Sequence, residues 1–184
     1  MKKTYYIASW EGTNGIYALE YDYERNAPVS LKNVASIDCA TYFDRRGDIL
    51  YALSETAGPG DFAGSLHSFR MTPEGGLERI ETLSGIPSGS PHLSLNGDYV
   101  CTASYNNGKV SSSRLLPGGR FGKISCIHQQ TGSSVRHDRQ EGPHAHIMCP
   151  SPEGYHVFCC DLGTDTIHAY LLDQSNGQLM LKTP

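Results

Sequence analysis

Short apolar runs alternate with polar turns along the whole chain. The clearest runs lie at residues 49–53, 99–103 and 157–160, and each follows a turn that contains glycine. Runs of this kind, rich in valine, tyrosine and other strand-forming residues, are typical of β-strands joined by tight turns. The pattern therefore predicts a nearly all-β chain.

The same order of strands and turns recurs three times. Each copy has a proline or polar lead-in, a first strand, a turn with glycine and a second strand, and then two more strands joined by a Gly-Gly or Asn-Gly turn. The turn glycines Gly47, Gly97 and Gly154 set a period of roughly fifty residues, which is within the range of four-stranded propeller blades. The three copies cover residues 42–80, 91–124 and 143–179.

The segment before these copies predicts part of another blade. Residues 6–10, 15–21 and 28–31 have the pattern of its later strands, as in a ring that closes by pairing its first and last strands. At this period 184 residues supply about three to four blades, whereas propellers typically have four to eight. We therefore expect residues 1–184 to be a partial β-propeller of four-stranded antiparallel blades, either part of a longer protein or completed by another chain. A β-sandwich explains the alternation but not the recurring order.

Composition removes several classes of function. Lys and Arg number 15 against 19 Asp and Glu, so no basic surface for nucleic acid is expected. The first apolar run stops at Ser9 and Trp10, too short for a leader or a membrane span, which predicts a cytoplasmic protein without a membrane partner. The six cysteines form no Cys-x-x-Cys pair and are expected to be reduced, with adjacent Cys159 and Cys160 on opposite faces of a strand.

The polar residues around Pro143 are the strongest candidates for chemistry. Pro143 favours extended geometry before it and predicts a strand start, on which His144 and His146 would share one face. Two imidazoles beside Arg139 and Glu141 could bind an anion, transfer a proton, hold a metal, or serve as hydrogen-bonded packing.

Two segments resemble one known family. Residues 142–146 (Gly-Pro-His-Ala-His) and 161–167 (Asp-Leu-Gly-Thr-Asp-Thr-Ile) are similar to the lactonase family of seven-bladed β-propellers. This family includes the propeller-type bacterial 6-phosphogluconolactonases and, as relatives, the fungal carboxymuconate-lactonising enzymes. The resemblance also covers residues 90–95, 103–111 and 139–141, and is weaker over the rest of the chain.

Departures from the family pattern bear on activity. Ser104 stands where many members have Asn, and Ser54 precedes Glu55 where Asn-Glu is common. The family continues to a Gly-Pro-Arg-His segment and a second Asn-Glu, which would lie beyond Pro184. The resemblance therefore implies an N-terminal half that is inactive when alone. A half ring also leaves one blade flank uncovered at each end, so the chain is expected to self-associate or to be marginally stable.

The resemblance implies hydrolysis of 6-phosphogluconolactone to 6-phosphogluconate, a step of the pentose phosphate pathway, without a cofactor. Lactone hydrolysis needs a general base for water, and His144 or His146 is the predicted base. His92, Tyr105 and Arg139 are the predicted contacts for a carboxylate or phosphate on the substrate. His92 occupies the same place in its blade as His144, so both are expected to point to one axis.

Three other interpretations stay open. His144 and His146 could bind zinc with a third ligand from His137, Asp138 or Glu141. The chain could be a non-catalytic propeller that binds a protein or a glycan, or a cycloisomerase of the carboxymuconate type. The remaining histidines are expected to be structural or exposed: His67, His128, His156 and His168.

Overall fold

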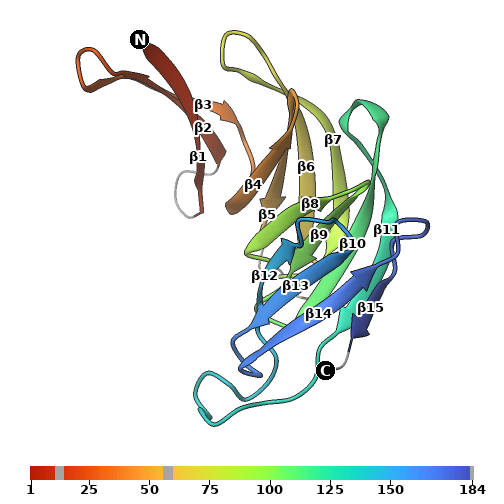
Figure 1. The fold of residues 1–184 in the computed structure, drawn as a ribbon. Coiled ribbons are helices and arrows are strands. Elements are labelled where there is room, and N and C mark those ends of the chain that lie inside the picture. Colours follow the sequence, from red (N-terminus) through yellow and green to blue (C-terminus); the bar gives the residue numbers. More distant parts are fainter. Residues whose placement is uncertain (11–14, 56–59, 183–184) are drawn as a thin grey trace.

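Four antiparallel sheets follow one another in the computed structural model, which describes residues 1–10, 15–55 and 60–182 (Figure 1). Residues 183 and 184 of the predicted domain lie outside this description. The first sheet has three strands and each of the others has four. The strands are β1 (Lys2–Ser9), β2 (Gly15–Asp22) and β3 (Ala27–Ala35); β4 (Ala40–Arg46), β5 (Ile49–Ser54), β6 (Gly64–Met71) and β7 (Leu77–Ile86); β8 (His92–Asn96), β9 (Tyr99–Ala103), β10 (Lys109–Leu116) and β11 (Arg120–Gln129); and β12 (Ala145–Pro150), β13 (His156–Asp161), β14 (Thr166–Leu172) and β15 (Leu179–Lys182).

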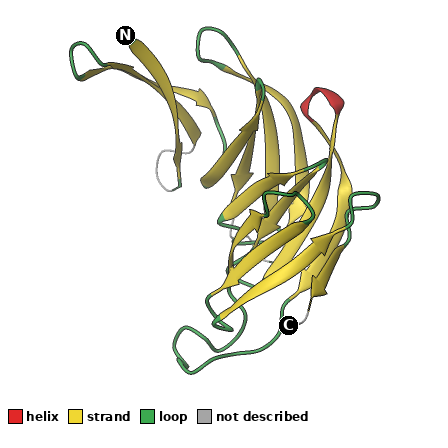
Figure 2. Ribbon diagram, in the orientation of Figure 1, coloured by secondary structure: helices red, strands yellow, loops and turns green. Residues whose placement is uncertain are grey.

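The sheets confirm the predicted fold class. Each of the three sequence copies forms one four-stranded sheet, and the leading segment forms the three-stranded sheet. The helical structure in the described residues is one 3₁₀ turn, Pro117–Gly119, drawn red in Figure 2. The described residues form four consecutive sheets and not the two packed sheets of a β-sandwich, so the sandwich alternative is wrong. None of the described segments is a helix long and apolar enough to cross a membrane.

Contacts between sheets show a blade-like arrangement. The first strands β4, β8 and β12 lie against one another in succession, and so do the last strands β7, β11 and β15. In the leading sheet β1 contacts β4 and β3 contacts β7, so β3 is in the position of an outermost strand. This agrees with the expectation that the leading segment supplies the later strands of its blade.

The hairpin turns confirm two of the expected turn glycines in detail. Arg46 pairs with Ile49 and Asn96 pairs with Tyr99, so each hairpin has a two-residue turn that begins with glycine. Gly47 and Gly97 have φ of 61° and 53°, in the left-handed region that glycine adopts most easily. Because successive hairpins reverse the chain, the loops after β5, β9 and β13 lie at one end of the sheets, and the turns after β4, β8 and β10 lie at the other.

The core consists of three apolar clusters, one between each pair of consecutive sheets. The cluster between the last two sheets includes Tyr99, Met148 and Tyr170, all fully buried. Cys101, Cys126, Cys149, Cys159 and Cys160 have free thiols, and Cys159 is buried while Cys160 is exposed, as the strand alternation predicts. Side chains of this size each contribute about 1.5–3 kcal/mol when buried, so the sheets hold together mainly through their faces.

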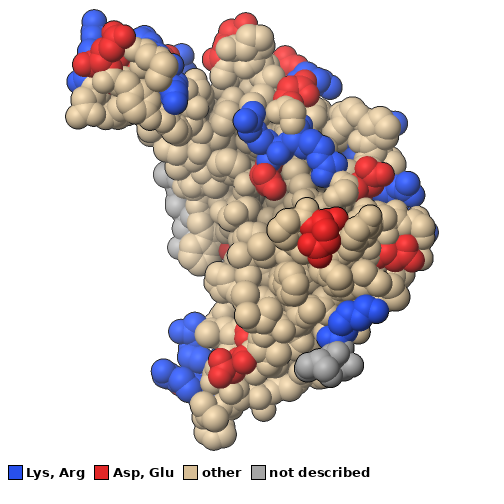
Figure 3. Space-filling view, in the orientation of Figure 1, with Lys and Arg blue, Asp and Glu red and all other residues tan. Residues whose placement is uncertain are grey.

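Charge is dispersed on the face shown in Figure 3. Lys and Arg side chains lie near Asp and Glu side chains, with wide areas that carry neither. This distribution accords with the slight excess of acidic residues in the sequence.

Candidate functional site

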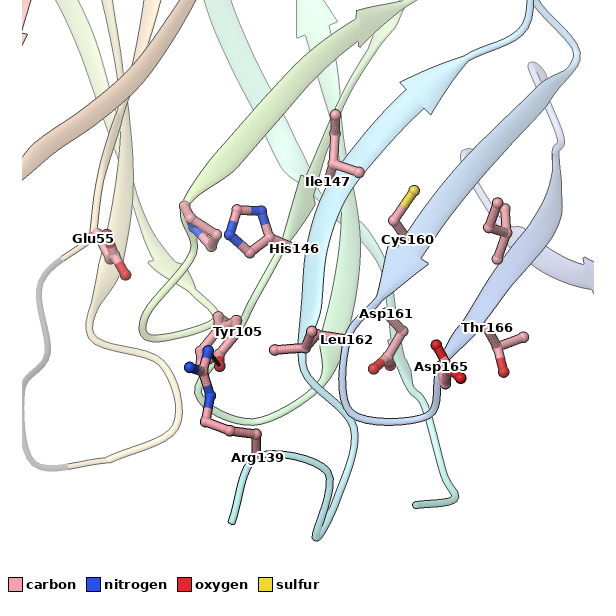
Figure 4. Close-up of a pocket in the computed structure, with 12 residues that line it drawn as sticks. Glu55, Tyr105, Arg139, His146, Ile147, Cys160, Asp161, Leu162, Asp165 and Thr166 are labelled. Carbon is pink, nitrogen blue, oxygen red and sulfur yellow. Dashed lines mark hydrogen bonds between the residues drawn. The ribbon is translucent and has the colours of Figure 1, made fainter. Parts of the chain in front are cut away.

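A pocket of about 930 Å³ lies where loops from three sheets meet (Figure 4). Glu55 follows β5, Tyr105 follows β9, and Arg139 and His146 come from the connection into β12 and from β12 itself. Figure 4 shows Glu55 on one side and the turn before β14 on the other, with Tyr105, Arg139 and His146 between them. A volume of this size can take a sugar-sized ligand.

The two predicted histidines differ in their surroundings. The strand begins at Ala145 rather than at His144, and the ladder with β13 shifts register between Ala145 and Ile147. His146 therefore lies at a bulge and His144 precedes the strand, so the prediction that one regular strand begins with both histidines is wrong. His146 is exposed and lines the pocket, whereas the side chain of His144 is 13% exposed.

Both ring nitrogens of His144 are occupied. Nδ1 lies 2.7 Å from the carbonyl oxygen of Tyr105, and Nε2 lies 3.0 Å from Oε1 of Glu141. Both ring nitrogens therefore have a partner within the protein, and neither is open to the pocket. The hydrogen bond from His144 contributes to lowering the pKa of Glu141, together with a larger contribution from the Glu141 backbone.

Tyr105 connects the two histidines with Arg139. Its ring stacks on His144 at a centroid distance of 4.5 Å and meets His146 edge-on at 5.9 Å. Arg139 Nη2 donates a hydrogen bond of 2.8 Å to the Tyr105 hydroxyl, and this bond is the main cause of the raised pKa of Arg139. Since the hydroxyl accepts from Arg139, its own hydrogen stays available for another acceptor.

Asp161 holds the histidine segment in place. Its Oδ1 accepts hydrogen bonds from the backbone N–H groups of His144, Gly163 and Thr164, at 2.8, 2.8 and 3.1 Å. The two segments approach so closely that a Cβ on Gly163 would lie 1.7 Å from the Gly142 carbonyl oxygen. The Asp-Leu-Gly run is therefore what positions the segment that precedes β12.

His92 lies outside this pocket, in a smaller recess of about 270 Å³ among the first strands of the sheets. Its ring packs on Tyr42 with centroids 4.2 Å apart, and Nδ1 accepts a 3.4 Å hydrogen bond from the Met148 N–H. Burial lowers the pKa of His92 to about 4, and the charge of His146 adds to this effect. His92 is thus neutral at pH 7, and the histidine whose charge acts on it is His146.

The zinc alternative gains no support from the geometry. Across residues 1–10, 15–55 and 60–182, no group of three or more His, Cys, Asp or Glu side chains is arranged to hold a metal ion. Glu141, one of the proposed third ligands, is hydrogen-bonded to His144 instead.

The pocket residues that were not predicted from the sequence include three polar ones in or beside its loops: Glu55, Asp165 and Thr166. Burial raises the pKa of Glu55, so this carboxyl group stands in a less polar environment than a surface glutamate. Asp165 has φ of 54°, an uncommon conformation for a residue with a side chain. All three lie in or beside loops at one end of the sheets. The sequence repeat predicts which loops lie at this end, so it could have identified these residues as candidates.

The sequence matches the model of a family described as lactonase, 7-bladed beta-propeller, over residues 4–184. It is 30% identical over 166 residues to the 6-phosphogluconolactonase of Bacillus subtilis, which covers 88% of this chain and 46% of that protein. An uncharacterised protein of Staphylococcus epidermidis is 29% identical over 174 residues, 90% of this chain and 49% of that protein. The chain thus spans about half the length of the curated relatives it matches.

Solved structures have the same fold. The periplasmic gluconolactonase of Pseudomonas aeruginosa superposes with a TM-score of 0.88 at 24% identity, over 98% of this chain and 53% of that one. A protein of Lactobacillus plantarum superposes with a TM-score of 0.82 at 20% identity, over 100% of this chain and 52% of that one. At this level of identity the structures establish the arrangement of the sheets. Since one of these proteins is periplasmic, the cytoplasmic location of this chain stays a prediction.

Proposed function

Because this chain belongs to the lactonase family of seven-bladed β-propellers, we propose that it is the N-terminal half of a propeller that hydrolyses a sugar lactone. The observation that carries the proposal is the pocket in which His146, Arg139 and Tyr105 face one volume. The 6-phosphogluconolactonase of Bacillus subtilis suggests 6-phosphogluconolactone as the substrate and 6-phosphogluconate as the product. This would place the protein in the pentose phosphate pathway.

His146 is the general base in this proposal. It takes a proton from a water molecule as the water oxygen bonds to the lactone carbonyl carbon, and negative charge develops on the carbonyl oxygen. The ring C–O bond then breaks, and the departing oxygen takes the proton from His146 to become a hydroxyl group. Among the two predicted bases, His146 is favoured because it is exposed in the pocket, whereas both nitrogens of His144 already have acceptors.

Arg139 and Tyr105 bind negative charge on the substrate. The Arg139 guanidinium is exposed at the pocket, and the Tyr105 hydroxyl hydrogen is free to donate beside it. Together they suit either the developing oxyanion or a phosphate or carboxylate on the lactone. His144 is a positioning residue, since its stack and its hydrogen bond fix the ring and the backbone of Tyr105. His92 lies in the neighbouring recess, and the charge of His146 contributes to its lowered pKa.

The test is the rate of 6-phosphogluconolactone hydrolysis, measured as acid release in a pH-stat. Where the chain hydrolyses the lactone, His146→Ala should lower the catalysed rate by about 10²- to 10⁴-fold, the usual contribution of a general base. The matched control is His156→Ala, which changes a half-exposed histidine at the opposite end of the sheets.

The chain alone is expected to be poorly active, so the second measurement is binding of the product, 6-phosphogluconate, to the pocket. Binding of 6-phosphogluconate without hydrolysis would support the half-propeller proposal. If neither is found, the lactonase assignment of this pocket is wrong.

A further inference from the structure

A second recess of about 590 Å³ lies at the opposite end of the sheets from the histidine pocket. It is formed by three turns of two neighbouring sheets, those that join β4 to β5, β8 to β9 and β10 to β11. The last of these contains the 3₁₀ turn visible in Figure 2. Because hairpins alternate between the two ends, no residue of this recess belongs to the proposed lactone site.

The floor of the recess is apolar and well packed. Ile49, Tyr51 and Leu115 line it and are 7, 4 and 8% exposed. The Tyr51 ring meets Phe121 edge-on at 5.8 Å, and Gly119 is so close to Ile49 that a Cβ there would lie 2.9 Å from it. These contacts hold the floor in one shape, as a binding surface requires.

The Tyr51 hydroxyl forms no hydrogen bond within the described part of the chain, although this tyrosine is almost completely buried. Burial raises its pKa, and the positive charge of Arg46 acts in the opposite direction, so the guanidinium lies near the phenol. The hydroxyl is not among the fully buried polar atoms that lack a partner, so it faces the solvent-accessible recess that Tyr51 lines. The group is therefore available to a ligand in the recess.

The rim carries two arginines and one acid. Arg46, Arg114 and Asp98 line the recess, and none of them forms an ion pair or a side-chain hydrogen bond among the residues that the structure describes. The local formal charge is one positive unit. Two guanidinium groups can bind a carboxylate through several donors, while Asp98 disfavours a ligand with two negative charges.

We propose that this recess binds a small monoanion with an apolar body, such as an aromatic carboxylate. The apolar part would lie on Ile49 and Leu115, and the carboxylate would accept hydrogen bonds from Arg46, Arg114 and the Tyr51 hydroxyl. The volume is within the usual range for small-molecule sites. The proposal is independent of lactone hydrolysis, since it uses different residues at the other end of the fold.

The probe is benzoate, titrated into the ¹⁵N-labelled 184-residue chain and followed by NMR. Saturable shifts are expected for the backbone amides of Gly118 and Gly119, which border the recess. Arg46→Gln and Arg114→Gln should each weaken binding about tenfold, and Asp98→Asn should strengthen it. Arg45→Gln is the matched control, because Arg45 precedes Arg46 on the strand but does not line the recess, and it should leave binding unchanged.

Two further ligands test which chemistry the recess selects. Benzamide has the same shape without charge and should bind at least tenfold more weakly, and inorganic phosphate should not saturate these signals. Equal binding of benzoate and benzamide, equal effects of Arg45→Gln and Arg46→Gln, or shifts that never saturate would each overturn the proposal. Chemical shifts away from the recess report whether a variant keeps its fold.

Discussion

His144 and His146, which are separated by one residue, have different roles in this structure. His144 is nearly buried, with hydrogen bonds to Tyr105 and Glu141 and a stacked ring, whereas His146 is exposed. His144→Ala should therefore lower the free energy of unfolding by about 1–3 kcal/mol, because it leaves the partly buried carbonyl of Tyr105 without its donor. His146→Ala should change it by less than about 0.5 kcal/mol. Urea unfolding measures both, and similar losses for the two variants would contradict the assignment.

A third histidine should make stability depend on pH. Burial, and then the charge of Arg79, lower the pKa of His67 from 6.5 to about 4. The folded state therefore disfavours the proton. The stabilisation from neutral His67 is complete above pH 6.5, is lost as the pH falls towards 4, and does not change below that.

After allowance for solvent screening, we expect this loss to be about 1–2 kcal/mol. Urea unfolding at pH 7 and at pH 4.5 should show a smaller difference for His67→Gln than for the unmodified chain. The pKa of His92 is also lowered to about 4, so in His67→Gln the difference in stability between pH 7 and pH 4.5 should become smaller but not disappear. An unchanged difference in His67→Gln would show that His67 does not titrate in this way.

At the scale of elements, the turn after β9 positions the site through one glycine. Gly108 has φ of 62°, and a Cβ there would lie 2.4 Å from Cβ of Pro143, the residue before His144. Gly47 is the matched control, since it has φ of 61° and a Cβ there would have nothing within 4 Å. Both Ala variants should suffer the strain of left-handed backbone, about 1 kcal/mol.

Gly108→Ala should lose about 1–3 kcal/mol more than Gly47→Ala, because Pro143 has to move. It should also weaken ligand binding at the histidine pocket, while Gly47→Ala should not. Denaturant unfolding and a binding titration of both variants check this. Equal stability of the two would mean that the contact with Pro143 does not position the segment.

Sequence patterns predict the elements better than they predict the site. Glycine turns and alternating apolar residues repeat with one period, so they reveal the blades and the hairpins at Gly47 and Gly97. The bulge at His146 was not predictable, because it depends on how Asp161 binds the preceding segment. The recess around His92 likewise depends on contacts between sheets, which a strand pattern does not encode.

At the scale of the whole molecule, the outward faces of the first and last sheets carry apolar side chains. Tyr5 and Leu31 on the first sheet are 40 and 60% exposed, and Phe158, Ile167 and Met180 on the last are 39, 67 and 42% exposed. Consecutive sheets elsewhere in the described chain bury such faces against each other. We propose that these two faces mediate self-association of the chain.

Sedimentation velocity over a range of concentrations should therefore show association. Met180→Lys should reduce it, because a charge on this face opposes burial. Val135→Lys, which changes an 84% exposed loop residue, should have no such effect. A monomer at all concentrations, or an equal response to the two substitutions, would contradict the proposal.

The most direct test of the proposed lactone site is calorimetric titration of the 184-residue chain with 6-phosphogluconate. We predict saturable binding with one site per chain, weakened at least about tenfold by Arg139→Gln, because Arg139 is the guanidinium that lines the pocket. Arg136→Gln is the matched control, since Arg136 is in the same connection, pairs with Asp138 and does not line the pocket. It should bind as the unmodified chain does. No saturable binding at millimolar concentration, or equal affinity in the Arg139→Gln variant, would contradict the proposed site.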